Sequence, residues 1–200
     1  GSVAAPTAGL HFTDRQMDQI DAKGIERANL CLHVGAGTFL PVKSELISDH
    51  HMHSEPFTVT LDFLERLQRH SMQTDVVAVG TTSTRTLESL YYLGVHTIEN
   101  GEPGSVEQWE PYREKGYAYT AQESINSLIN YLKKNNKTEL TSRTSLIIVP
   151  GYEFRRVTYL VTNFHQPKST LLLLISAFIG DGWRQMYRFA LDNDFRFLSY

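Results

Sequence analysis

A short polar segment lies between two apolar runs near the end of the chain, and it constrains the fold more than any other feature. Thr158–Thr162 is rich in β-branched and aromatic residues, which is typical of a buried strand. After it, Pro167 keeps the preceding residue out of the helical region. Ser169 and Thr170 are good N-cap residues for a helix that begins near Leu171. The sequence therefore predicts a strand, a loop and the N-terminus of a helix.

The loop of this unit carries Asn163, His165, Lys168 and Ser169, whose polar side chains could contact a ligand. Free N–H groups of the helix and polar side chains of the loop can converge on an anionic ligand at the carboxyl end of a strand. Alternatively, the loop is only a well-capped connection, because a single histidine in a loop is more often solvated than catalytic. Taken alone, these residues leave both interpretations open.

A second unit of the same kind lies in the middle of the chain. Asp75–Val79 predicts a short apolar strand, and Gly80–Thr82 leads into a helix that we expect to end near Gly94. Arg85 lies one turn into this helix, where it suits a carboxylate, a phosphate or a ribose hydroxyl. The unit lacks the lysine of a P-loop, which disfavours nucleoside triphosphate hydrolysis. Simple helix capping is again the alternative.

The densest group of titratable residues lies at 49–55, directly before the strand-like segment 57–60. If that strand extends back, then His51, His53 and Glu55 share one face. Two histidines and a carboxylate can bind a transition metal or transfer protons near neutral pH. We favour proton transfer or ligand contact, because alternate positions on a strand are not a specific zinc signature.

A glycine-rich turn follows the strand-like segment 28–34. Gly35 and Gly37 invite comparison with a dinucleotide-binding loop, but Leu40 occupies the position of the third glycine and Pro41 opposes the helix that should follow. A Rossmann fold is therefore rejected. Such a turn can instead bring its backbone close to a ligand or to another chain segment.

Strands and helices alternate along the rest of the chain. We expect helices over 15–23, 61–72, 120–134 and 182–191 and a strand over 144–149, with an irregular stretch from 96 to 116. This alternation indicates one α/β domain over 1–200, with a mixed, partly parallel sheet flanked by helices.

Composition excludes several classes of protein. The net charge of -3 over 200 residues gives no broad cationic field, so composition does not predict nucleic-acid binding. Cys31 is the only cysteine, which excludes an intrachain disulfide and a zinc ribbon and favours a reducing compartment. The apolar run 171–179 is about half as long as a membrane span requires. We expect no targeting segment and no membrane contact.

A set of motifs occurs in a fixed order along nearly the entire chain. They are Val3–Thr13, Leu32–Phe39, Met52–Glu55, Gly80–Thr82 with Arg85–Glu88, Pro150–Tyr152, Thr162–His165 with Pro167–Leu171, and Arg196–Phe197 with Ser199–Tyr200. Together they resemble the S-adenosylmethionine:tRNA ribosyltransferase-isomerase family of queuosine biosynthesis. The resemblance covers only the carboxyl-terminal part of that family. It implies that the family's inserted β-barrel domain is absent from this chain and that 95–144 is an insertion within the α/β domain.

The resemblance implies a tRNA-modifying transferase and isomerase in the cytoplasm. S-adenosylmethionine would donate its ribosyl group to the aminomethyl-deazaguanine base at the tRNA wobble position, giving epoxyqueuosine with release of adenine and methionine. The donor would be a consumed substrate, so no cofactor is expected, and we expect a monomer. Because a sulfonium acidifies the adjoining ribose carbon, the reaction needs a base of near-neutral pKa and hydrogen-bonding partners for the departing adenine.

Carried over motif by motif, the resemblance implies His165 or His53 as the base, with Glu55 orienting the base or sharing its proton. His11 and His33 are secondary catalytic candidates. The expected substrate-binding residues are Gly35, Gly37, Thr38, Thr81, Thr82, Arg85, Asn163, Lys168, Ser169 and Thr170. No metal ligand is expected. Because the near-neutral composition does not by itself support tRNA binding, we expect either a local basic patch of Arg155, Arg156 and Lys168 or contacts made by the absent domain.

Two other hypotheses stay open. The chain could be catalytically incomplete or a divergent paralogue, and so only bind tRNA or S-adenosylmethionine. It could also be a metal-dependent hydrolase built on the histidines and carboxylate of 50–55.

Overall fold

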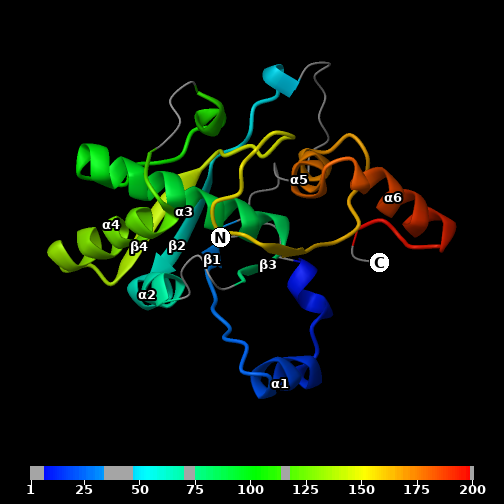
Figure 1. Ribbon diagram of the computed structural model, residues 1–200, viewed down its shortest axis with the longest axis horizontal. Helices are drawn as coiled ribbons and strands as arrows, with labels where there is room; N and C mark the ends of the chain where they lie inside the picture. Colours follow the sequence, from blue (N-terminus) through cyan, green and yellow to red (C-terminus); the bar gives the residue numbers. More distant parts are fainter. Residues whose placement is uncertain (1–6, 34–46, 70–74, 114–117, 199–200) are drawn as a thin grey trace.

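Two small sheets with helices around them make up the fold (Figure 1). The computed structural model describes residues 7–33, 47–69, 75–113 and 118–198. β1 (Cys31–Leu32), β2 (Glu55–Thr60) and β4 (Glu139–Thr144) form an antiparallel sheet in the order β1–β2–β4. β3 (Val77–Val79) and β5 (Tyr159–Val161) form a separate parallel pair. The α/β class is therefore confirmed, but the described parallel and antiparallel strands lie in two sheets, not in one mixed sheet.

The core is built around α3 (Thr81–Asn100), which packs against α4 (Ala121–Lys134). Contrary to expectation, α3 does not end near Gly94. A Cβ atom on Gly94 would lie 2.0 Å from the Ser124 hydroxyl oxygen and 2.3 Å from the Ser124 carbonyl oxygen. The glycine is thus a contact point between two helices, since only a residue without a side chain allows this approach.

Two other expected helices form over the described residues, and 70–72, the expected end of the first, lie outside them. α2 (Leu61–Arg69) buries Leu64 and Leu67 against the core. On its solvent side, Arg66 forms an ion pair with Glu26. α4 begins with a capping box and ends at the polar run that follows Lys134. The period of apolar residues was a sufficient signal in both cases.

The carboxyl-terminal part of the chain forms a helical pair, α5 (Thr170–Ile179) and α6 (Gly182–Asp192), on the right in Figure 1. Phe164 stacks on Phe197 with a ring-centroid distance of 4.4 Å and contacts Tyr187 at 4.6 Å. These aromatic rings fasten the chain after α6 to the loop after β5.

The amino-terminal elements lie at the lower side of Figure 1, where α1 (Asp14–Ala22) stands away from the other helices. A capping box formed by Thr13 and Gln16 starts this helix, and none of its residues is buried. The 3-10 helix η1 (Thr7–His11) precedes it and buries Ala8. The expected helix over 15–23 is therefore confirmed within one residue at each end.

Residues 145–149 of the strand expected over 144–149 lie outside the ladder, because β4 covers Glu139–Thr144. Leu146, Ile147 and Ile148 are buried. Their backbone groups bind other partners: Ile147 donates to the Gln108 carbonyl, and its own carbonyl accepts from the Tyr112 hydroxyl. The run is thus core without being strand, since tertiary partners replace the ladder bonds.

The segment 95–144 contributes to this core. It contains the end of α3, the 3-10 helix η4 (Glu110–Tyr112), α4 and β4. β4 pairs with all six residues of β2. That the segment is an insertion relative to the family stays a prediction.

Two further observations complete the description of the fold. The short 3-10 helix η3 (Ile47–Asp49) precedes the histidines at 50–53. Within the described ranges, no helix combines the length and the apolar character needed to cross a membrane.

Candidate functional site

The parallel pairing of β3 with β5 places the two strand-loop-helix units side by side. Val79 lies opposite Val161, and the N–H of the next residue, Gly80, donates to the Val161 carbonyl at 2.8 Å. Gly80 has a φ of 98°, a conformation that favours glycine. The N-terminus of α3 and the loop 162–169 therefore start at the same edge of the sheet, as parallel strands require.

The loop after β5 ends in a capped helix, as predicted. The Ser169 hydroxyl accepts from the Leu172 N–H at 3.3 Å and donates to the Gln166 carbonyl at 2.8 Å. Thr170 is buried as the first residue of α5, whereas Lys168 is exposed and has a positive φ of 57°. The Lys168 ammonium is thus available to an anion.

Asn163 connects this loop to the amino-terminal part of the chain. Its side-chain Nδ2 donates to the Thr7 hydroxyl at 2.7 Å. Ala8 packs beside Gly80, since a Cβ atom on this glycine would lie 3.9 Å from the Cβ of Ala8. The short helix η1, with exposed His11 at its end, therefore lies at the edge where the two loops meet.

His165 is buried within the loop, with 6% of its surface exposed. Its Nε2 lies 2.8 Å from the Thr162 hydroxyl, and its carbonyl accepts from the Tyr187 hydroxyl at 2.8 Å. Burial lowers the pKa of His165 to about 4. The imidazole is therefore neutral at physiological pH, and it is a weak base.

Glu55 and Arg85 form a buried ion pair at the start of β2 and one turn into α3. Arg85 Nη1 lies 3.1 Å from Glu55 Oε2, and Arg85 Nε donates to the Leu146 carbonyl at 2.9 Å. Burial raises the pKa of Glu55, while the neighbouring guanidinium opposes this shift. Burial lowers the pKa of Arg85, and Glu55 opposes that shift in turn. In the described part of the chain, Arg85 Nη2 is buried without a hydrogen-bond partner.

Residues 50–53 lie ahead of β2 and include His50, His51 and His53; they are called the histidine segment below. The expectation that His51, His53 and Glu55 share a strand face is wrong, because β2 begins only at Glu55. His51 and His53 are exposed, whereas Glu55 is 5% exposed. Across the described ranges, no group of three histidine, cysteine or acidic residues could hold a metal ion. The hypothesis of a hydrolase metal site at 50–55 therefore has no support from this geometry.

Other sequence candidates are only partly placed. Gly35, Gly37 and Thr38 lie outside the described residues. His33 is exposed at the end of β1, and its N–H donates to the Pro56 carbonyl at 3.1 Å. At the N-terminus of α3, Thr81 is buried and Thr82 is half-buried. His33 thus lies beside the start of β2, next to the residue that pairs with Arg85.

The expected basic patch is wrong for one of its three members. Arg156 is 7% exposed, and its Nη2 donates to the Leu67 carbonyl at 2.8 Å. Arg155 lies over the Tyr91 ring at 5.2 Å and forms an ion pair with Glu153 at 3.1 Å. These arginines serve the packing of the chain, and Lys168 is the exposed member of the three.

Sequence reasoning missed the role of Glu88, which is fully buried in α3. Its Oε1 accepts from the Arg156 and Val157 N–H groups at 3.0 and 2.9 Å. Its Oε2 accepts from the Arg155 N–H at 2.8 Å and from the Tyr152 hydroxyl at 2.9 Å. Its partners lie 64 to 69 positions away in the sequence, so the local pattern carried no signal for this role. This carboxylate fixes the segment that leads into β5.

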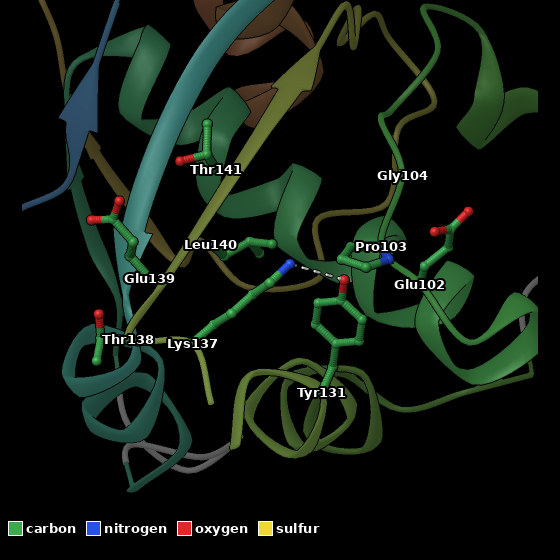
Figure 2. A pocket seen from close by; sticks show the side chains of 9 residues that line it. All are labelled: Glu102, Pro103, Gly104, Tyr131, Lys137, Thr138, Glu139, Leu140 and Thr141. Carbon is green, nitrogen blue, oxygen red and sulfur yellow. Dashed lines mark hydrogen bonds between the residues drawn. The ribbon is translucent and has the colours of Figure 1, made fainter. Parts of the chain in front are cut away.

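Figure 2 shows a surface hollow of about 500 Å³. It is lined by Glu102, Pro103, Gly104, Tyr131, Lys137, Thr138, Glu139, Leu140 and Thr141. The Lys137 ammonium lies 3.4 Å from the Tyr131 hydroxyl. No candidate site residue lines it, so it does not correspond to the site predicted from the sequence.

The comparisons with known proteins agree on one family. A model of that family, described as queuosine biosynthesis protein, matches residues 1–200. S-adenosylmethionine:tRNA ribosyltransferase-isomerase from Paraburkholderia phymatum is 43% identical over 202 residues, which cover 100% of this chain and 47% of that protein. The protein of the same name from Burkholderia ambifaria is 42% identical, with the same coverage. The chain thus spans about half the length of these relatives.

A solved structure supports the same assignment. The crystal structure of S-adenosylmethionine tRNA ribosyltransferase from Thermotoga maritima matches with a TM-score of 0.59 and 32% identity, covering 96% of this chain and 49% of that one. Sequence similarity and structural similarity therefore indicate the same family. The chain belongs to the queuosine biosynthesis protein family.

Proposed function

We propose that this chain transfers and isomerises the ribosyl group of S-adenosylmethionine onto the aminomethyl-deazaguanine base at the tRNA wobble position. The products are epoxyqueuosine, adenine and methionine. The observation that carries the proposal is the parallel pairing of β3 with β5, which brings two hydroxyl-rich helix N-termini to one edge. The names of the relatives, which refer to this donor and to tRNA, support the same reaction.

The donor carries groups that suit this edge. Its carboxylate is attracted by free N–H groups at the start of a helix, which Thr81 and Thr82 begin in α3. Lys168 supplies a positive charge from the opposite loop, beside the hydroxyls of Ser169 and Thr170. Arg85 holds Glu55 in place, and an acceptor brought near Arg85 would satisfy its buried Nη2.

The proton-transfer roles divide between two places. His53 is exposed ahead of β2 and is the candidate base for the proton beside the sulfonium. Glu55 follows two residues later and is held inward by Arg85, where it can orient a donor hydroxyl. His165 is a weak base with a pKa of about 4, which favours a role as a neutral hydrogen-bonding group for the substrate. Asn163 then fixes the loop that carries His165 by its bond to Thr7.

Adenine release tests this proposal. The chain is incubated with S-adenosylmethionine and tRNA bearing the precursor base, and free adenine is followed by chromatography. We expect His53→Gln to lower the rate about 100-fold, as loss of a general base does. His51→Gln is the matched control, since His51 is exposed in the same segment, and its rate should stay within about twofold of the wild type. Equal rates for the two variants would remove His53 from its proposed role.

A second pair of variants tests the donor site. Lys168→Met removes the exposed charge of the loop, and we expect a higher KM for S-adenosylmethionine, by about tenfold. Lys137→Met removes a lysine from the hollow of Figure 2, which no candidate site residue lines, and should leave KM unchanged. A KM effect of the same size in both variants would contradict the placement of the donor.

A chain that only binds is the second candidate function. It is favoured by one observation, that the chain spans about half the length of its relatives. Calorimetry with S-adenosylmethionine or tRNA separates the two candidates. Binding without adenine release supports the second candidate, and adenine release with turnover rejects it.

A further inference from the structure

The side chain of Gln108 connects the histidine segment to a distant part of the chain. Its Nε2 donates to the His50 carbonyl at 2.6 Å, and the Met52 N–H donates to its Oε1 at 2.9 Å. One amide thus holds the backbone on both sides of His51. Both hydrogen-bonding atoms of this side chain are used on the histidine segment, so its geometry is specific to that task.

Arg143 holds the other side of His53. Its Nε lies 3.1 Å from the Ser54 hydroxyl oxygen, and its Nη2 donates to the Ser54 carbonyl at 3.0 Å. The exposed His53 therefore lies between two tethered neighbours, Met52 and Ser54. Both tethers come from the segment 95–144, and neither Gln108 nor Arg143 was a candidate from the sequence.

The backbone around Gln108 is itself fixed on the β4 side. Its carbonyl accepts from the Ile147 N–H at 3.1 Å. Two residues earlier, Val106 donates to the Arg143 carbonyl at 3.0 Å and accepts from the Ser145 N–H at 2.9 Å. The opposite side of this loop is closed by His96 of α3 and Glu110 of η4.

The His96 ring lies between two acceptors. Its Nε2 is 2.6 Å from Glu110 Oε1, and its Nδ1 is 2.9 Å from the Pro103 carbonyl oxygen. A carbonyl only accepts, and an ionised carboxylate only accepts, so both bonds form together only while the ring and the carboxyl group hold two protons in all, one on Nδ1 and one shared between Nε2 and Oε1. The other Glu110 oxygen accepts from the Glu107 N–H at 3.1 Å. Loss of one of these protons would set a ring lone pair against either the Glu110 carboxylate or the Pro103 carbonyl, so one of the two bonds next to the loop that carries Gln108 would be lost.

The charges that act on this ring all favour the protonated form. They are the carboxylates of Glu110, from η4, and Glu99, from α3, and with the bond to Pro103 they raise the pKa of His96, while burial opposes this shift. A raised pKa means that the clamp is complete below the ordinary value of 6.5 and is lost as pH rises through the raised value.

We infer that Gln108 is a positioning residue that holds His53 in place for proton transfer, and that the His96–Glu110 pair makes this hold depend on pH. The inference rests on the proposed function, in which His53 is the base. Gln108 does not touch the reacting atoms; it acts through the backbone of Met52. The segment 95–144 thereby gains a role at the site.

Hydrogen exchange of the Met52 amide in the substrate-free chain tests the hold directly. Gln108→Met keeps the side-chain length but removes both bonds, and we expect the Met52 amide to exchange about five- to tenfold faster. Gln122→Met is the matched control, because Gln122 donates to Asn126 within α4 and contacts none of these groups. An unchanged Met52 exchange rate in Gln108→Met overturns the inference and leaves the proposed function standing.

A separate variant tests whether the hold on the Met52 amide depends on pH. Glu110→Gln is isosteric, and its amide can donate to a neutral His96 ring while its oxygen still accepts from the Glu107 N–H. After division by the intrinsic exchange rate, wild-type protection of Met52 should fall as pH rises above 6.5, and protection in Glu110→Gln should stay flat. The same decline in both proteins rejects the pH-dependent clamp.

Adenine release completes the test. We expect Gln108→Met to lower kcat about tenfold, because a misplaced proton acceptor weakens only the transition state, with the KM for S-adenosylmethionine unchanged. Faster Met52 exchange with an unchanged kcat would overturn the positioning role. No adenine from the wild-type chain would overturn the proposed function, and the exchange experiment would still decide whether Gln108 holds the histidine segment.

Discussion

Acidification should destabilise this protein through His165. The side chain is 6% exposed, and burial lowers its pKa from 6.5 to about 4. The folded state therefore binds fewer protons than the unfolded state between these two values, so stability is present above pH 6.5 and is lost as pH falls toward 4. A difference of about 2.5 pKa units, at 1.36 kcal/mol per unit, corresponds to about 3 kcal/mol in the free energy of unfolding.

Urea unfolding at pH 7, 6, 5 and 4 measures this effect. The comparison uses wild type, His165→Asn and, as a control, His51→Asn, which changes an exposed histidine of the histidine segment. Other groups titrate in all three proteins, so the difference between wild type and His165→Asn isolates the buried ring. That difference should shift by about 3 kcal/mol between pH 7 and pH 4 in favour of the variant.

The refuting result is a pair of parallel curves. If wild type and His165→Asn lose the same free energy of unfolding from pH 7 to pH 4, then the imidazole is not held neutral by burial. A shift of equal size in His51→Asn would refute the reasoning as well, because an exposed ring has no burial to lose.

Three substitutions test the packing beneath the site. Glu88→Gln places an amide NH2 group against backbone N–H donors, so we expect the free energy of unfolding in urea to fall by about 3 kcal/mol. A loss below about 1 kcal/mol would contradict the proposed importance of this carboxylate. Gly94→Ala brings a Cβ atom to 2.0 Å from Ser124 Oγ. The overpacking should lower stability by about 1–3 kcal/mol, although alanine has the better helix propensity. A rise in Tm would contradict this helix contact. Arg85→Met leaves the buried Glu55 without this partner and should lower the free energy of unfolding in urea by about 3–5 kcal/mol. Adding Glu55→Gln to this variant should recover more than half of that loss. No recovery would show that the pair is not coupled.

Much of the local structure is determined by the sequence itself. The signals at Thr13, Thr120 and Ser169 specify helix starts, and all three residues cap their helices with side-chain bonds. Capping and periodicity depend on residues within a few positions of each other, so they can be read without knowing the fold. The order of strand, loop and helix in the two units was predictable for the same reason. The expectation that the strand over 158–162 is buried was wrong, because Tyr159 and Val161 of β5 are 56% and 39% exposed.

The tertiary structure decided which polar residues meet. Gly94 reads as a helix end, yet the approach of α4 makes it a helix interior. Arg156 reads as a basic surface residue, but the binding of its backbone to Glu88 draws it inside. Glu55 and the neighbouring histidines read as one group, and only the long-range bond to Arg85 separates them. Burial and hydrogen-bond partners of this kind depend on residues 30 or more positions apart, as in the pairing of Glu55 with Arg85, and local pattern carries no record of them.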